Sequence, residues 1–200
     1  LIEKALVTLD EALSAYPEGF IKELCYGNQK KIEILLCGSI KDKTVPENAT
    51  GFTSYIGYAL EHSGKNIIML DITSPSSEEQ TVYHEIMHLI DFKMAFDAKM
   101  RKNARFSEEG WAKLNPEGFI YPERTYDLPE DIYKAGYENY FVDLYSKTTP
   151  KEDRARIMEY AMAGEDYVFS SSPERVKKLN YLSDCIMDAF DTSSWNGKTR

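Results

Sequence analysis

The sequence predicts an α+β fold: a small sheet plus an N-terminal helix, then a long central helix, then a mainly helical C-terminal half. Three short apolar segments lie before residue 73, the stretch 76–101 contains neither proline nor glycine, and two further helix-start signals follow residue 148. From the length of 200 residues we expect a single domain. Within it, residues 1–101 would form a sheet lobe with the central helix, and residues 102–200 a mainly helical lobe.

The first elements follow from local pattern. Residues 3–16 carry leucines at helical spacing and are followed by Pro17, which predicts a helix that stops there. Three short, apolar and β-branched segments are interpreted as buried strands, the last two joined by the turn-like sequence HSGK. These segments are residues 32–40, 53–60 and 66–72.

The remaining elements are helices and one irregular segment. Ser74 as N-cap and Pro75 at the first helical position predict the start of the central helix, which we expect to end near residue 100. Residues 103–140 are rich in glycine, proline and aromatic residues, and are interpreted as mostly non-helical. Further helices are predicted to start at Thr149-Pro150 and Ser172-Pro173. The last helix should bury one apolar face, made by Val176, Leu179, Leu182, Ile186 and Phe190.

Composition and charge limit the classes of function. The chain is 42% hydrophobic and 28% charged, as folded globular proteins are, and its net charge of -9 argues against a nucleic-acid partner. No apolar stretch reaches the roughly 18 residues that a transmembrane helix needs. Cys25, Cys37 and Cys185 are too few and too scattered for a disulfide framework, so we interpret them as small apolar residues of the interior.

The segment VYHEIMH, residues 82–88, carries the most specific chemical signal. Residues four apart lie on one face of a helix, so His84 and His88 can direct imidazole nitrogens at one ion about 2 Å away. Glu85 lies beside them, where its carboxylate can take a proton from a water on that ion. The spacing therefore predicts a catalytic zinc site, with two ligands and a general base supplied by a single helix.

A catalytic zinc needs a third protein ligand. The one other histidine, His62, is interpreted as an exposed turn residue, so a carboxylate should complete the site. Asp91 follows the histidines on the same helix, and one straight helix can hardly wrap three ligands around an ion. Glu152 is favoured, because a separate helix start can close the site from the opposite side. The carboxylates considered are Asp91, Glu138, Asp143, Glu152, Asp153 and Glu159.

Other readings of these residues remain open. Tyr145, seven residues before Glu152, is either a phenol that donates to a developing oxyanion or a half-buried packing aromatic. Thr149 and Glu152 also have the spacing of a capping box, which needs no metal. Asp91 and Asp153 are interpreted either as partners for the far nitrogens of the zinc histidines or as ordinary helix-surface charges.

These residues resemble the gluzincin-type peptidases of the anthrax lethal factor and Pro-Pro endopeptidase group. The resemblance is closer to a bacterial family of zinc-binding metallopeptidases that are often secreted or surface-anchored. It rests on HEIMH, on Tyr145 with Glu152 seven residues later, and on the segments YPEGF, HEIMHLID, WAKLNPEGF and YSKTTPKEDRA, which together span residues 16–160. The resemblance implies a zincin-like fold, zinc bound by His84, His88 and Glu152, Glu85 as the base, and Tyr145 as the transition-state donor.

The expected function is that of a zinc-dependent metalloendopeptidase acting on a peptide or protein substrate. The resemblance implies that it is secreted or anchored at the cell surface, through a signal or lipid anchor outside this sequence. One alternative is a zinc-dependent amide hydrolase or deacylase acting on cell-wall fragments; another is an inactive zinc-binding module. Glu85 argues against the inactive module, because a structural zinc site has no use for a base. The chain departs from the family at Arg156, where a carboxylate is more usual.

Overall fold

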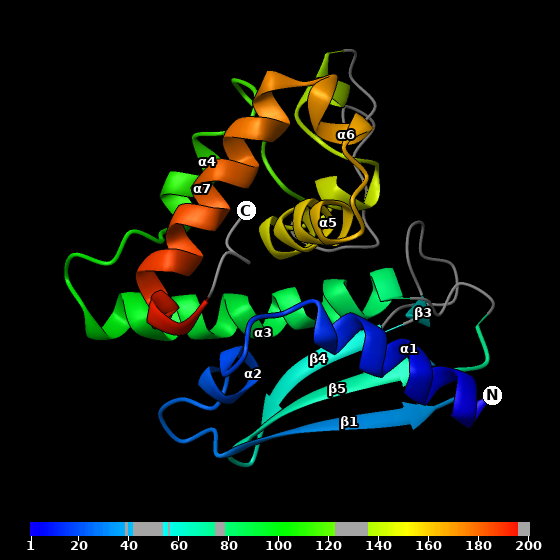
Figure 1. The fold of residues 1–200 in the computed structure, drawn as a ribbon. Coiled ribbons are helices and arrows are strands. Elements are labelled where there is room, and N and C mark those ends of the chain that lie inside the picture. Colours follow the sequence, from blue (N-terminus) through cyan, green and yellow to red (C-terminus); the bar gives the residue numbers. More distant parts are fainter. Residues whose placement is uncertain (39, 42–53, 56, 75–78, 123–135, 196–200) are drawn as a thin grey trace.

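A long central helix, α3 (Glu79–Met100), separates a small sheet on one side from a group of helices on the other (Figure 1). The structure is a computed structural model. It describes residues 1–38, 40–41, 54–55, 57–74, 79–122 and 136–195. The mixed α and β composition, the small sheet and the mostly helical second half agree with the fold class predicted from the sequence.

The sheet has the strand order β1–β5–β4, with β5 parallel to β1 and antiparallel to β4. These strands are β1 (Lys31–Cys37), β4 (Gly57–His62) and β5 (Lys65–Asp71). A separate antiparallel pair joins β2 (Ile40–Lys41) to β3 (Ser54–Tyr55). The β4–β5 hairpin turns through Ser63 and Gly64, whose φ angles of 50° and 77° match the twist of a two-residue hairpin.

Burial within the sheet is concentrated in its central strand. Alternate residues of β5, namely Asn66, Ile68 and Leu70, are buried against the rest of the protein. The strand predicted over residues 32–40 is confirmed as β1, but its predicted burial is wrong, because β1 lies at the edge of the sheet and has no fully buried side chain. The predicted strand over residues 53–60 lies partly outside the described residues, and its described end, β4, forms the other edge.

Helix α3 is covered on both sides, by the sheet lobe with α1 (Ile2–Ser14) and α2 (Phe20–Glu23), and by the helices of the second half. A helix in this position must be apolar around most of its circumference. Its buried apolar residues are Val82, Tyr83, Ile86, Met87, Leu89, Ile90 and Met94. The helix ends at Met100, as predicted, whereas Pro75 of its predicted start lies outside the described residues.

The second half confirms both predicted helix starts. The Thr149 hydroxyl accepts a hydrogen bond from the backbone N–H of Glu152, and the Ser172 hydroxyl accepts one from that of Arg175. The described part of the segment predicted to be mostly non-helical contains one short α-helix, which has Ser107 as its N-cap, and one turn of 3₁₀ helix. The elements are α4 (Glu108–Ala112), η2 (Tyr137–Asn139), η3 (Tyr145–Lys147), α5 (Pro150–Met162), α6 (Tyr167–Ser170), α7 (Pro173–Ala189) and η4 (Thr192–Ser194).

Several apolar side chains lie nearer the surface than their spacing predicts. Val176 is 36% exposed on α7, while Lys178 on the same helix is fully buried. The interior interpretation of the cysteines is right only for Cys185, because Cys25 and Cys37 are half-buried; all three are free thiols. Helical periodicity therefore located α7 correctly but misassigned part of its buried face.

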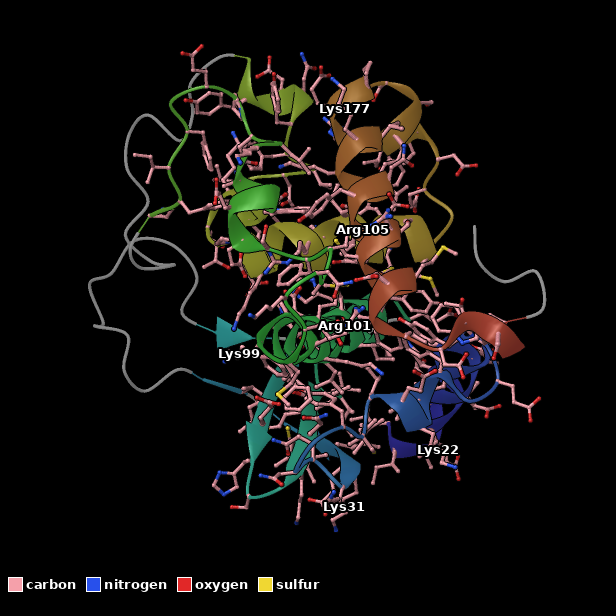
Figure 2. The ribbon with its side chains drawn as sticks, turned by 90° about the vertical axis from the view of Figure 1, so that its left-hand side faces the viewer. Lys22, Lys31, Lys99, Arg101, Arg105 and Lys177 are labelled. Carbon is pink, nitrogen blue, oxygen red and sulfur yellow. The ribbon has the colours of Figure 1, made fainter. Side chains whose placement is uncertain are left out.

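Basic side chains on the face shown in Figure 2 come from separate elements and are spread from one end of the molecule to the other. Four of them pair with carboxylates: Arg101 with Asp97 and Asp188, Arg105 with Asp184, Lys31 with Glu33, and Lys177 with Glu174. These labelled residues therefore do not combine into one strongly basic patch.

Candidate metal centre

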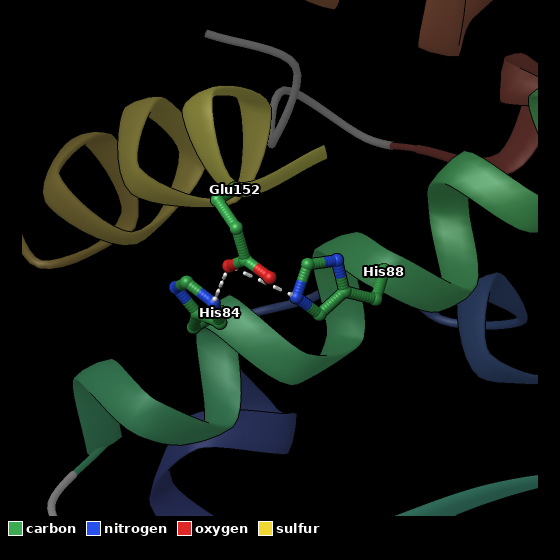
Figure 3. A group of neighbouring side chains, drawn as sticks. All are labelled: His84, His88 and Glu152. Carbon is green, nitrogen blue, oxygen red and sulfur yellow. Dashed lines mark hydrogen bonds and ion pairs between the residues drawn. The ribbon is translucent and has the colours of Figure 1, made fainter. Parts of the chain in front are cut away.

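Two histidines and a glutamate from different helices meet between α3 and α5. His84 and His88 lie on the same face of α3, and the carboxylate of Glu152 reaches down from the first turn of α5 between their rings (Figure 3). One Glu152 oxygen, Oε2, lies 2.9 Å from His84 Nε2 and 3.5 Å from His88 Nε2. The structure thus brings together the three residues that the sequence predicted as ligands.

The spacing of these atoms fits a metal ion. Ligand atoms about 2.1 Å from a tetrahedral ion lie about 3.4 Å from one another. The candidate ligand atoms all lie within 4.8 Å of one another, and His84 is buried while the other two side chains are half-buried. Two imidazoles with one carboxylate are also a donor set that suits a catalytic zinc. These residues could therefore hold a metal ion.

Glu85 and Tyr145, the two predicted catalytic residues, border this cluster. The Glu85 side chain is only 3% exposed, and its Oε2 atom has no hydrogen-bond partner among the described residues. Burial raises the pKa of Glu85, while the neighbouring His88 and His84 act in the opposite direction. The Tyr145 ring stacks near that of His84, with centroids 5.9 Å apart. An acceptor and a phenol thus lie beside the same candidate ligands.

The far nitrogen of His84 is held by a residue whose role the sequence analysis missed. His84 Nδ1 lies 3.0 Å from Glu159 Oε2. Neither Asp91 nor Asp153 plays this part, so their interpretation as partners of the histidines is wrong: Asp153 hydrogen-bonds to Lys178, and Asp91 to Arg154. Glu159 follows Glu152 by seven residues, two helical turns, and this spacing on one helix face was the available signal.

Helices α3 and α5 are fastened to each other next to the site. Arg154 on α5 donates from Nε to Asp91 of α3 at 2.7 Å, and both side chains are almost completely buried. The same guanidinium also binds both carboxylate oxygens of Glu108 on α4. Because His88 precedes Asp91 by one turn and Glu152 precedes Arg154 by two residues, this ion pair helps fix the distance between the ligands of the two helices.

The other candidate ligands lie elsewhere. His62 is exposed at the end of β4, and Glu138 is exposed and accepts a hydrogen bond from the backbone of Gly136. Asp143 pairs with Arg156. The capping function at the start of α5 uses the backbone N–H of Glu152, so its carboxylate is available to the histidines. The two readings of Glu152, cap and ligand, are therefore compatible.

In the protein without metal, the pKa values of His84 and Glu152 are shifted in opposite directions. Burial alone lowers the pKa of His84, but hydrogen bonds to Glu152 and Glu159 outweigh it and raise this pKa from 6.5 to about 10. Burial has the opposite effect on Glu152, yet the two histidines hold the pKa of its carboxyl well below its usual range. At neutral pH, His84 is therefore an imidazolium between two carboxylates.

We expect metal binding at pH 7 to release about one proton from His84, because a metal takes only the neutral imidazole. Since the pKa of the metal-free form is about 10, metal affinity should rise with pH until that value is passed. Calorimetric titration with zinc, in buffers of different ionisation enthalpy, counts the protons released. A binding enthalpy that is independent of the buffer would contradict this expectation. The same protonation stabilises the metal-free fold at pH below 6.5, and that contribution is lost as the pH rises through about 10.

Comparisons with protein-family models, curated proteins and solved structures found no match for this chain. In the part of the chain that the structure describes, no helix is both long and apolar enough to cross a membrane. The residues of the candidate metal centre and their geometry are therefore the features that point to a function.

Proposed function

We propose that this protein is a zinc-dependent metalloendopeptidase of the gluzincin type, with a zincin-like fold, acting outside the cytoplasm. The observation that carries the proposal is the convergence of His84, His88 and Glu152 from two helices. The buried Glu85 oxygen, which has no hydrogen-bond partner among the described residues, supports it further, because such a carboxylate oxygen beside the candidate ligands is an acceptor available for proton transfer.

Each residue of the cluster has a role in peptide hydrolysis. His84, His88 and Glu152 would hold the zinc, which, when bound, supplies Lewis acidity to the scissile carbonyl and acidifies water. Glu85 takes a proton from the attacking water and returns it to the leaving amine. The Tyr145 phenol donates a hydrogen bond to the developing oxyanion. The burial of Glu85 and His84 keeps these interactions in a region of low dielectric, where they are strong.

Replacing Glu152 by glutamine tests the proposal against a purely structural role. The backbone N–H that Thr149 caps is unchanged in Glu152→Gln, so helix α5 should still form. An amide is a poor zinc ligand, so we expect zinc affinity to fall by more than about 100-fold, beyond the loss typical of an outer-sphere change. Cleavage of a degenerate peptide library should fall with it. Zinc content and peptide cleavage, measured side by side, give the result.

Glu174→Gln is the matched control, because Glu174 occupies the first turn of α7 behind the similar Ser172-Pro173 start. It should retain zinc and activity. Full zinc occupancy and cleavage in Glu152→Gln would overturn the assignment of Glu152. Wild-type protein that binds zinc but hydrolyses cell-wall fragments in place of peptides would favour an amide hydrolase.

A further inference from the structure

Arg156 contacts two carboxylates, Asp143 and Glu159, next to the candidate metal centre. It stands on α5, one turn after Glu152, and its side chain is 20% exposed. Its Nη1 donates to both oxygens of Glu159 at 2.6 Å. Its Nε donates to Asp143 Oδ2 at 2.9 Å, and its Nη2 contacts the same oxygen. A guanidinium is suited to this geometry, because its donors form a rigid planar fork.

One of the two carboxylates that Arg156 binds, that of Glu159, also contacts the candidate metal ligand His84. Glu159 Oε2 accepts a hydrogen bond from Arg156 Nη1 and also lies 3.0 Å from His84 Nδ1. A carboxylate on the far nitrogen of a histidine ligand fixes the ring orientation and its tautomer. Arg156 donates hydrogen bonds to both oxygens of this carboxylate, so it restricts the rotation of the Glu159 side chain. Because Glu159 contacts His84 Nδ1, it also restricts the orientation of the His84 ring and therefore the direction in which Nε2 points.

The second carboxylate that Arg156 binds, that of Asp143, belongs to the turn that contains Tyr145. Asp143 Oδ1 accepts the backbone N–H of Ser146 at 2.9 Å, and the Ser146 hydroxyl donates to the Asp143 carbonyl at 2.7 Å. These bonds close the turn around Tyr145, the first residue of η3. Arg156 on α5 donates a hydrogen bond to the other oxygen of the Asp143 carboxylate, Oδ2, so it links this turn to α5.

We propose that Arg156 is a positioning residue that couples the Tyr145 turn to the metal ligand His84, through Asp143 and Glu159. The inference rests on the proposed function and deepens it. The carboxylate on His84 comes from Glu159, one turn after Arg156, and Arg156 holds that carboxylate in place. A single side chain thus aligns both the ligand and the oxyanion donor.

The contact of Arg156 with Glu159 and its contact with Asp143 can be tested separately by substitution. Glu159→Gln should weaken zinc binding by about 10- to 100-fold, because His84 loses its charged partner. Asp143→Asn should leave zinc affinity within about twofold of wild type and lower kcat with little change in KM, because it loosens only the Tyr145 turn. Arg156→Met should show both effects. Arg156→Lys keeps the charge without the fork, so it should recover only part of each loss.

Zinc affinity is measured by competition with a chromophoric chelator, and ligand geometry by the visible spectrum of the cobalt-substituted protein, so neither readout needs turnover. Arg101→Met is the matched control: Arg101, labelled in Figure 2, also bridges two carboxylates, Asp97 and Asp188, but just beyond the C-terminal end of α3. It should leave zinc affinity, the cobalt spectrum and kcat unchanged.

Three results would overturn the inference. The first is wild-type zinc affinity and kcat in Arg156→Met, and the second is complete recovery of both by Arg156→Lys. In either case the proposed function stands if the wild-type protein binds zinc and cleaves peptides. The third, a wild-type protein that binds neither zinc nor cobalt, overturns the proposed function as well.

Discussion

Replacing Glu85 by glutamine is expected to lower kcat for peptide hydrolysis by about 10²- to 10⁴-fold, the usual contribution of a positioned general base. Glutamine has the same shape but cannot accept the proton of the attacking water. The Glu85 side chain is almost completely buried, and its free oxygen atom has no competing donor among the described residues. Zinc content should not change, because Glu85 is not among the three candidate ligand residues.

This prediction is measured as kcat and KM on a peptide cleaved by the wild type, together with zinc content by mass spectrometry. Glu79→Gln is a control on the same helix, since Glu79 is exposed in the first turn of α3. It should retain activity. If Glu85→Gln cleaves within about tenfold of the wild-type rate with zinc bound, another group must act as the base.

Replacing Lys178 by methionine is expected to lower the free energy of unfolding by about 3–5 kcal/mol, as the loss of one partner of a buried ion pair does. Lys178 is fully buried on α7, and its ammonium lies 2.6 Å from Asp153 Oδ2. It also stands 3.9 Å above the ring of Phe141. Burial lowers the pKa of Lys178 and raises that of Asp153, so each charged form depends on the other.

The variant leaves a carboxylate in the interior without its cation. Asp153 Oδ2 still accepts hydrogen bonds from Tyr121 and Trp111, at 2.7 and 3.1 Å, but these neutral donors do not balance its charge. The double variant Lys178→Met/Asp153→Asn should therefore recover part of the loss, because an amide oxygen can keep both bonds. We would follow urea unfolding of the chelator-treated protein by circular dichroism.

Lys177→Met is the control, because the neighbouring Lys177 side chain is 68% exposed and should change stability by less than about 0.5 kcal/mol. A loss below about 1 kcal/mol in Lys178→Met would mean that the interior reorganises around the unpaired Asp153. Because Asp153 follows Glu152 directly, a shift of α5 in these variants would also be visible as weakened zinc binding.

The sequence predicted those parts of the site that depend on spacing along one helix or on a local cap. His84 and His88 share a face because they lie four residues apart, and Thr149 with Pro150 marks the start of α5 in two consecutive positions. The approach of Glu152 to the histidines was also predicted, from the need for a third ligand on a separate segment. The first two inferences use information held within a few residues of chain, whereas the third joins positions 68 residues apart and came from the chemistry of a zinc site.

The contacts that the sequence did not reveal join residues far apart in the chain. Glu159 meets His84 across 75 positions, and Lys178 meets Asp153 from another helix. From sequence alone, a lysine is interpreted as a surface charge, and its burial becomes evident only when the structure shows its carboxylate partner. The edge position of β1 was missed for a related reason, because strand order is set by pairing between segments and not by the apolar pattern of one strand.

The most direct test of the central claim is the position of zinc in crystals of the protein, located by anomalous diffraction at the zinc absorption edge. The account predicts one strong peak about 2 Å from His84 Nε2, from His88 Nε2 and from a carboxylate oxygen of Glu152. Zinc bound elsewhere, with these three side chains still hydrogen-bonded to one another, would contradict it.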